Sequence, residues 1–455
     1  MTEALKKVYF LGIGGIGMSA LARFLKSTGV EVHGYDKTPS VLTAELEAEG
    51  MKIHYEDRPD LIPEDTGLII YTPAVPTDLE EYKKAASGAF SMMKRSELLG
   101  VITAKKRTLA VAGTHGKTTV SSMLAHIMHT SVLGCTAFLG GIAKNYDSNL
   151  LLNPESDFMV TEADEFDRSF LTLSPHSAVI TSADADHLDI YHTHQGLKAS
   201  FSDFTSKIRD NGHLVIKHGV DLELKTTENV GIYTYSLDKD SDFAAQNIRL
   251  TGRRYSFDIR TPNGVITGLQ PPLPGIFNIE NSVAAAAVAW LNGVCNCEIK
   301  EAINSFTGVR RRFDHRVISD RVIYIDDYAH HPEELKACFR AVRALYPDKQ
   351  ITAIFQPHLY TRTRDFADAF AESLSMPDRI ILLDIYPARE LPIEGVSSAM
   401  LLDKITIGDK QLSTKEGVLE LIDRLEPELL LTMGAGNIDR LVEPITELLN
   451  KKGEK

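Results

Sequence analysis

Short apolar runs alternate with longer amphipathic segments along the N-terminal part of the chain. Residues 8–11, 30–36 and 68–71 have the composition of buried strands, and residues 18–27 have the spacing of a helix. Strands that are separated by helices in this way predict a parallel sheet with helices on its faces.

The same alternation begins again at Arg107 and once more near the basic cluster at residues 310–312. Between these points, residues 243–270 alternate less regularly and contain turn residues, which indicates a small antiparallel segment. The pattern predicts an α/β protein of three domains, at residues 1–106, 107–313 and 314–455. Further strands are expected at residues 109–112, 158–161, 178–181, 322–325, 351–354, 380–383 and 429–432.

Composition narrows the class of protein. Of the 455 residues, 43% are apolar and 24% are charged, as in an ordinary globular protein. The net charge of -13 argues against nucleic acid and against an anionic membrane as partners. We expect no signal peptide, because glycines break the apolar stretch that follows residues 1–7. We expect no membrane span, because no apolar run approaches roughly 18 residues. The cysteines form no CxxC pair and are expected to be reduced, which favours the cytoplasm: Cys135, Cys295, Cys297 and Cys338.

A glycine-rich turn follows the first predicted strand. The segment Gly12-Ile13-Gly14-Gly15-Ile16-Gly17 matches GxGxxG, and Asp36 closes the second strand. The glycines let backbone amides approach a diphosphate, whose charge a helix N-terminus favours. The carboxylate of Asp36 can accept hydrogen bonds from ribose hydroxyls. The motif predicts a nucleotide diphosphate site and, taken alone, is compatible with NAD.

A second glycine loop also connects a predicted strand to a helix: Gly113-Thr114-His115-Gly116-Lys117-Thr118-Thr119. In such a loop the amides surround phosphates, Lys117 neutralises the terminal phosphates, and Thr118 offers its hydroxyl to Mg²⁺. The loop is shorter than the standard P-loop, because Val111 stands where that motif has a glycine. We predict that it binds ATP and magnesium for chemistry. The central domain is thus expected to be a P-loop-type ATPase domain, between two Rossmann-like α/β domains.

Two acidic segments follow predicted strands of the central domain. Residues 162–167, with the sequence EADEFD, place carboxylates next to the phosphate loop, which suggests metal ligation because Mg²⁺ prefers hard oxygen ligands. A solvated acidic loop is the alternative. Residues 184–189 follow the next strand, and His187 there could bind a second metal, orient one, or be structural.

Polar segments with histidine and arginine follow two strands of the C-terminal domain. They are residues 326–332, DDYAHHP, and residues 356–364, QPHLYTRTR. Adjacent strand ends that hold histidine and arginine are suited to binding a carboxylate and a reacting phosphate. An exposed polar loop is the alternative for each segment.

Taken in order, these motifs resemble those of the Mur ligase family of ATP-dependent amide-forming enzymes. The likeness covers nearly the whole chain and rests on GIGGIGMSALA, AGTHGKTT, EADE-x-D, DDYAHHP, FQPH-x-YTRTRD and GAGNID. It implies that the N-terminal domain holds the UDP part of the substrate, that the central domain uses ATP and Mg²⁺, and that the C-terminal domain brings the amino acid. The motifs look most like those of members that join L-alanine to UDP-N-acetylmuramate through an acyl phosphate, in peptidoglycan precursor synthesis.

The resemblance also implies residue roles. The diphosphate would contact Gly14, Gly15, Ile16, Gly17 and Met18, with Asp36 nearby. ATP would contact the loop 113–119 together with Asn278, Asn281, Arg312 and Asp327, and the metal ligands would be Thr118, Glu162 and His187. The amino-acid site would comprise Tyr328, His330, His358 and Arg362. The catalytic groups implied are Lys117, Glu162, His187 and His330, and the proton of the ammonium goes to His330, His187 or solvent.

One position in the amino-acid motif departs from the family pattern. Leu359 stands where alanine-adding members usually have arginine, so Arg362 or Arg364 must hold more of the amino acid's carboxylate. Phe277 similarly replaces a usual histidine beside Asn278.

Three other functions are weighed against the ligase. An NAD-dependent dehydrogenase would leave the loop 113–119 without a role. A related ligase that attaches a preformed peptide to UDP-N-acetylmuramate would share the central domain. A non-catalytic nucleotide sensor would have no use for Glu162, His187 and Arg362 together.

Overall fold

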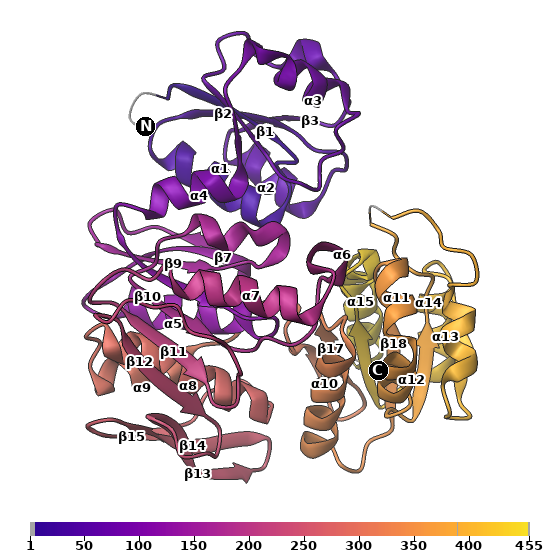
Figure 1. The fold of residues 1–455 in the computed structure, drawn as a ribbon. Helices are drawn as coiled ribbons and strands as arrows, with labels where there is room; N and C mark the ends of the chain where they lie inside the picture. Colours follow the sequence, from indigo (N-terminus) through magenta and orange to yellow (C-terminus); the bar gives the residue numbers. More distant parts are fainter. Residues whose placement is uncertain (1–4, 389, 454–455) are drawn as a thin grey trace. The chain divides into compact units, whose positions relative to one another are not determined.

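The computed structural model describes residues 5–388 and 390–453, and the chain divides into two compact units. The first unit comprises residues 1–249, 256–272 and 279–307. The second comprises residues 250–255, 273–278 and 308–455. The elements form three separate sheets, of five, ten and six strands in chain order (Figure 1).

The N-terminal sheet has five parallel strands in the order β3-β2-β1-β4-β5. Alternate residues of β1 point to opposite faces: Val8 and Phe10 join one apolar core with α1, α2 and α4, whereas Tyr9 and Leu11 join another near α3 (Figure 1). Strand order reverses at β1, so the turn that follows β1 lies at a ligand-binding switch point. The strands are β1 (Lys7–Leu11), β2 (Glu31–Tyr35), β3 (Lys52–His54), β4 (Leu68–Tyr71) and β5 (Met92–Lys94), and the helices are α1 (Ile16–Ser27), α2 (Val41–Ala48), α3 (Glu80–Lys84) and α4 (Arg95–Thr103).

The central sheet has the order β15-β14-β13-β12-β11-β10-β6-β9-β7-β8. From β13 to β7 its strands are parallel, and β8 and β15 pair antiparallel at its two ends. β6 lies between β9 and β10, so the segments that follow these three strands meet at one edge. The strands are β6 (Arg107–Ala112), β7 (Thr136–Ala143), β8 (Ser148–Leu151), β9 (Phe158–Glu162), β10 (Ser177–Ile180), β11 (His213–Lys217), β12 (Gly231–Ser236), β13 (Phe243–Thr251), β14 (Arg254–Thr261) and β15 (Gly264–Leu269).

Within the described residues, five helices belong to the central part of the chain. The buried apolar residues of the central sheet and of the N-terminal sheet form one hydrophobic core. Phe24 of α1 packs on Phe138 of β7, with ring centroids 5.3 Å apart. The helices are α5 (Lys117–Thr130), α6 (Leu188–Tyr191), α7 (His194–Thr205), α8 (Ile276–Leu291) and α9 (Asn296–Ser305), with a 3₁₀ segment η4 at Phe166–Thr172.

The C-terminal sheet has the order β16-β17-β21-β18-β19-β20, with only β16 antiparallel. β21 lies between β17 and β18, so the polar segments after β17 and β18 flank the GAGN turn that follows β21. The elements are β16 (Asp314–Ile318), β17 (Ile323–Asp327), α10 (Pro332–Leu345), β18 (Ile351–Phe355), α11 (Tyr360–Asp365), α12 (Ala367–Leu374), β19 (Arg379–Leu382), α13 (Ser398–Lys404), β20 (Lys410–Leu412), α14 (Val418–Leu425), β21 (Leu429–Met433) and α15 (Val442–Gly453).

The cysteines differ from the prediction in one respect. Cys135 and Cys338 are buried free thiols, as expected. Cys295 and Cys297 are joined by a disulfide, so the prediction that all four are reduced was wrong for this pair. Cys295 is the N-cap of α9 and Cys297 lies in its first turn, which places their Cα atoms 5.5 Å apart, within reach of a bridge. No helix within the described residues has both the length and the apolar character that a membrane crossing requires.

Candidate active site

Two glycines shape the loop between β6 and α5. Gly113 has φ +133° and Gly116 has φ +81°, in the region that residues with side chains rarely adopt. A Cβ atom added at Gly113 would overlap the Thr181 hydroxyl, and one at Gly116 would lie 3.1 Å from the Asn281 side-chain oxygen. The loop therefore turns sharply into α5, whose first N–H groups have no acceptor inside the helix and are suited to phosphate.

The segment after β10 braces this loop. The Thr114 amide donates to the Ser182 carbonyl oxygen at 3.2 Å, and the His115 amide donates to the Ser182 hydroxyl at 2.8 Å. The Asp184 amide donates to the Thr114 hydroxyl at 3.1 Å, and His115 Nε2 lies 3.6 Å from Asp184 Oδ2. Two predicted ATP contacts, Thr114 and His115, are thus held in place by the neighbouring strand end.

The ammonium group of Lys117 is held inside the loop. Its Nζ atom donates to the carbonyl oxygen of Gly113 at 2.6 Å and to the carboxylate of Glu165 at 2.8 Å. Glu165 is fully buried. Burial by itself would lower the pKa of Lys117, but nearby carboxylates, Glu165 foremost, outweigh burial and raise it. Lys117 is therefore positively charged at the mouth of the phosphate loop.

Thr118 and Glu162 form a pair next to Lys117. The Thr118 hydroxyl lies 3.2 Å and 3.1 Å from the two carboxylate oxygens of Glu162. A side chain at Gly140 would overlap the Glu162 carboxylate, so a glycine makes room for this acid. Hydroxyl and carboxylate oxygens are ligands that Mg²⁺ accepts, and Mg²⁺ usually takes water and substrate phosphates as its remaining ligands. The pair fits a magnesium ion carried by ATP.

His187 lies next to Glu165 as well. Its Nε2 atom is 3.7 Å from Glu165 Oε1 and 3.7 Å from Asp186 Oδ2, and its ring packs edge-on against Phe166 at 5.4 Å. Within residues 5–388 and 390–453, three or more His, Cys, Asp or Glu side chains do not gather into a metal-binding group. The fit for magnesium thus rests on Thr118 and Glu162, and metal ligation by His187 stays a prediction.

The glycine turn after β1 is built around Asp36. The Gly14 amide donates to Asp36 Oδ2 at 2.8 Å, and the Thr38 amide donates to Oδ1 at 3.2 Å. A Cβ atom at Gly14 would lie only 2.7 Å from the Thr43 side chain. Asp36 therefore holds the turn in shape through these two hydrogen bonds. Its contact with a ribose stays a prediction.

The helix after this turn offers backbone groups and one neighbouring cation. Met18 is 2% exposed and belongs to the apolar core, so its contact with the diphosphate stays a prediction. A Cβ atom at Gly17 would lie 3.0 Å from Nη1 of Arg95, whose Nη2 is 3.5 Å from Asp164 Oδ2. A guanidinium beside a diphosphate turn is well placed to bind phosphate. Sequence reasoning missed Arg95, because no motif marks the start of α4.

In the second unit, Asp327 is tied to the backbone on both sides. Its Oδ2 accepts from the Phe313 amide and its Oδ1 from the Ala329 amide, each at 2.7 Å. Burial raises the pKa of Asp327 to about 6, against the opposing effects of Arg312 and of these hydrogen bonds. The Arg312 guanidinium carbon lies 4.7 Å from the centroid of the Tyr328 ring. Arg312 and Asp327 thus belong to one cluster, which also includes the predicted amino-acid contact Tyr328.

Asn278 is buried and donates from Nδ2 to the Pro274 carbonyl oxygen at 2.7 Å. Phe277, which stands in place of a histidine, packs edge-on against Phe313 at 5.8 Å. An adenine contact for Asn278 stays a prediction.

The predicted amino-acid residues Tyr328, His330 and His358 lie next to one another. The His330 ring centroid is 5.3 Å from that of Tyr328 and 6.0 Å from that of His358. His330 Nδ1 lies 3.0 Å from the Tyr328 carbonyl oxygen and 3.3 Å from Glu334 Oε2, and these contacts orient the ring. Tyr386 stacks on His358, with ring centroids 5.7 Å apart. Sequence reasoning did not single out Glu334 or Tyr386.

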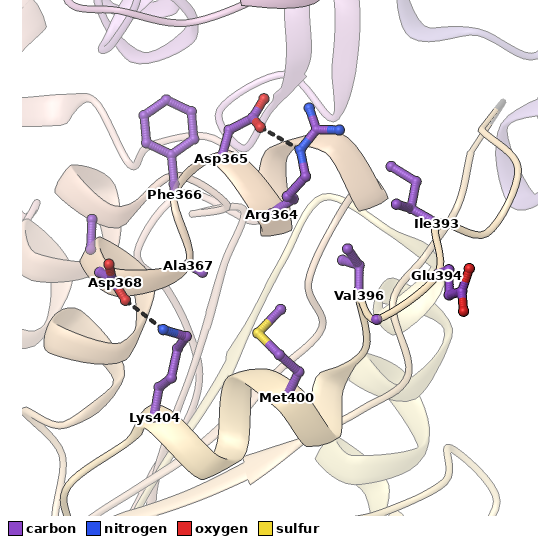
Figure 2. Close-up of a pocket in the computed structure, with 12 residues that line it drawn as sticks. Arg364, Asp365, Phe366, Ala367, Asp368, Ile393, Glu394, Val396, Met400 and Lys404 are labelled. Atoms are coloured by element: carbon purple, nitrogen blue, oxygen red, sulfur yellow. Dashed lines mark hydrogen bonds and ion pairs between the residues drawn. The ribbon is translucent and has the colours of Figure 1, made fainter.

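The arginines of α11 occupy different surroundings. Arg362 is buried, whereas Arg364 is exposed and donates to Asp365 at 2.7 Å. Arg364 lines a cavity of about 610 Å³ together with Phe366 and Met400, and Figure 2 shows its hydrogen bond to Asp365 there. Leu359 is buried at φ +68°, so its side chain contributes to packing. The geometry favours Arg362 over Arg364 as the partner of an amino-acid carboxylate.

Comparisons with known proteins define the class to which this site belongs. The model described as "Mur ligase family, catalytic domain" matches residues 7–107, "Mur ligase middle domain" matches 111–289, and "Mur ligase, glutamate ligase domain" matches 311–436. The chain belongs to the Mur ligase family and is an ATP-dependent amide-forming ligase. The predicted resemblance is confirmed, and the dehydrogenase and the nucleotide sensor are excluded.

Individual relatives are similar over the full chain. A UDP-N-acetylmuramate–L-alanine ligase of Parabacteroides distasonis is 54% identical over 98% of both chains, and one of Phocaeicola vulgatus is 50% identical over 99% of both. Among solved structures, the UDP-N-acetylmuramate-alanine ligase of Thermotoga maritima superposes with a TM-score of 0.83 at 25% identity, covering 98% of this chain and 99% of that one. A murein peptide ligase from Psychrobacter arcticus shares the fold, with a TM-score of 0.74 at 20% identity and 98% coverage of both. The predicted three-domain α/β architecture is confirmed, while its boundaries at residues 106 and 313 stay predictions.

Proposed function

We propose that this enzyme joins L-alanine to the lactyl carboxylate of UDP-N-acetylmuramate, with cleavage of ATP to ADP and phosphate, as a step of peptidoglycan precursor synthesis. The observation that carries the proposal is the convergence of Lys117, Thr118 and Glu162 at the ends of two adjacent parallel strands. The full-length similarity to UDP-N-acetylmuramate–L-alanine ligases supports the choice of both substrates.

The reaction balances in two steps. A carboxylate oxygen of the UDP-sugar attacks the γ-phosphorus of ATP, the bond to the β-phosphate oxygen breaks, and ADP leaves with the electron pair. The amine of alanine then attacks the carbonyl carbon of the acyl phosphate, phosphate leaves, and the nitrogen loses a proton to a base. His330, His187 and solvent are the candidates for that base.

The protein contributes position and charge to the first step. The ammonium group of Lys117, held by the Gly113 carbonyl oxygen, is ready to neutralise charge on the transferred phosphoryl group. Thr118 and Glu162 would hold the magnesium ion, which supplies charge neutralisation when bound with ATP. The turn after β1, which Asp36 braces through the Gly14 amide, would offer the backbone amides at the start of α1 to the UDP diphosphate.

In the second unit, the proposed amino-acid site combines a buried cation with aromatic surfaces. Arg362 would pair with the carboxylate of alanine, and the rings of Tyr328 and His330 would border the small side chain. Because ATP and the UDP-linked sugar are cytoplasmic metabolites, we place the reaction in the cytoplasm.

The competing proposal is a ligase that accepts a preformed peptide, as the name of the Psychrobacter relative indicates for that protein. Phosphate release should be measured with ATP and UDP-N-acetylmuramate, adding L-alanine, D-alanine or an L-alanyl peptide in separate reactions. The proposal expects release with L-alanine only. Release with the peptide and none with L-alanine would replace the proposed function by the competing one.

A further inference from the structure

Glu165 lies beside Lys117 of the predicted phosphate loop. Sequence reasoning treated it only as one of several carboxylates in the segment 162–167. In the structure its side chain has no exposed surface, and its two carboxylate oxygens each lie 2.8 Å from Nζ of Lys117. A carboxylate with no exposed surface requires a charged partner, and Lys117 supplies it.

We infer that Glu165 is a positioning residue, which fixes the ammonium group of Lys117 in the orientation that neutralises charge on the phosphoryl group during its transfer. The inference rests on the proposed function and assigns Glu165 no contact with substrate. An ammonium group has three N–H donors. One N–H group of Lys117 donates to the Gly113 carbonyl oxygen, and a second donates to the Glu165 carboxylate. These two hydrogen bonds fix the direction in which the third N–H group points.

The backbone around Glu165 is itself tightly held. Its carbonyl oxygen accepts a hydrogen bond from the buried Tyr191 hydroxyl at 2.6 Å and another from the Arg168 amide at 2.9 Å. Asp167 and Arg168 both adopt left-handed backbone conformations, with φ +53° and +54°. Such conformations persist only where surrounding contacts enforce them. The backbone that carries the carboxylate is therefore rigid, as a positioning residue requires.

The charge of Glu165 makes a distinctive kinetic prediction. A buried negative charge close to bound phosphates opposes the ground-state binding of ATP, so its role is not to raise affinity. Glu165 instead contributes in the transition state, when charge develops on the transferred phosphoryl group. The Lys117 ammonium group, already held in place by Glu165, stabilises that charge without reorienting. Loss of Glu165 should therefore reduce kcat and leave the affinity for ATP unchanged or higher. A residue that merely supports the fold would reduce both.

The test compares Glu165→Gln with Glu165→Asp in the full-length enzyme. Glu165→Gln keeps the size of the side chain and removes its charge, and we expect kcat to fall by about tenfold or more while the Kd of ATP, from calorimetry, rises no more than about twofold. Glu165→Asp keeps the charge at a shorter reach and should recover part of kcat. Asp203→Asn, which removes one charge from an exposed ion pair with Lys225, serves as the matched control and should leave both constants unchanged.

Further measurements separate a positioning role of Glu165 from a role in the fold. If Glu165→Gln lowers the Tm or fails to fold, Glu165→Asp carries the test: a lower kcat with the Kd of ATP within about twofold of the unmodified enzyme supports the inference. A Kd of ATP that rises in parallel with the fall in kcat, or no fall in kcat for Glu165→Asp in that case, overturns it. Glu165→Gln with kcat within about twofold of the unmodified enzyme also overturns it. Absence of alanine-dependent turnover in the unmodified enzyme would instead overturn the proposed function.

Discussion

Arg362 and Arg364 lie on the same short helix, α11, yet only Arg362 is buried, at 7% exposure. The side chain of Arg364 is 53% exposed and is paired with Asp365. This difference predicts that the two arginines have different roles.

Arg362→Lys should raise the KM for L-alanine by about ten- to a hundredfold, because a lysine cannot reproduce a bidentate pair with a carboxylate and a charged hydrogen bond is worth about 1.5–3 kcal/mol. The KM for ATP should change little. Arg364→Lys is the matched control, with alanine kinetics expected to equal those of the unmodified enzyme. The reverse pattern in steady-state assays would mean that Arg364 holds the amino acid.

Lys117→Ala should abolish turnover, because it removes the charge at the mouth of the phosphate loop. Affinity for UDP-N-acetylmuramate should stay nearly the same, since the glycine turn of that site follows β1 in another sheet. Phosphate release and calorimetry measure the two effects, with Lys225→Ala at the exposed surface as the control. A loss of UDP-substrate affinity greater than about tenfold, roughly 1.4 kcal/mol, would contradict this separation of sites.

Glu162→Gln should raise the concentration of Mg²⁺ needed for half-maximal activity by about tenfold, because a carboxylate is a stronger ligand for a hard cation than an amide. Thr118→Ser keeps the hydroxyl that pairs with Glu162 and should retain the Mg²⁺ dependence of the unmodified enzyme. Activity titrated against Mg²⁺ at saturating ATP gives both values. An unchanged Mg²⁺ requirement in Glu162→Gln would exclude Glu162 from the metal site.

A buried cluster in the N-terminal sheet predicts a pH effect on stability. Glu81 accepts hydrogen bonds from the Tyr9 hydroxyl at 2.5 Å and from the Arg58 amide at 2.9 Å. Burial raises the pKa of Glu81 from 4.5 to about 7, against the effect of these bonds. Because the folded-state pKa is the higher one, the stabilising contribution is complete below pH 4.5 and is lost as the pH rises through 7.

The free energy of unfolding should therefore fall by up to about 3 kcal/mol more between pH 4.5 and pH 7 in the unmodified protein than in Glu81→Gln. Denaturant unfolding at several pH values measures this difference, with Glu64→Gln at the exposed surface as the control. Parallel pH profiles for the unmodified protein and Glu81→Gln would show that Glu81 does not titrate in this range.

The sequence predicted the positions of strand ends well. Lys117, Glu162 and His187 follow three neighbouring parallel strands, and the register of β6, β9 and β10 brings them to one edge. The alternation of strands and helices can be read from the sequence. Parallel strands that are joined by helices all end at the same edge of the sheet, so the alternation also predicts that these residues lie together.

Side-chain orientation could not be predicted in the same way. Asp36 points into its own turn, Leu359 points into the core, and Arg95 reaches the turn from a helix that is distant in sequence. Each orientation depends on a contact between residues far apart in the chain. Glu165 illustrates the same point, because the segment 162–167 contains several acids and only the packing of η4 selects the one that meets Lys117.

In the proposed reaction, the enzyme activates the carboxylate of UDP-N-acetylmuramate with ATP and transfers the acyl group to L-alanine. The most direct test uses UDP-N-acetylmuramate labelled with ¹⁸O in the lactyl carboxylate, together with ATP, Mg²⁺ and L-alanine, and analyses the products by mass spectrometry. We expect a UDP-sugar that has gained one alanine through an amide, and one ¹⁸O atom in the released phosphate. Phosphate without ¹⁸O, or a UDP-sugar of unchanged mass, would contradict the proposed reaction.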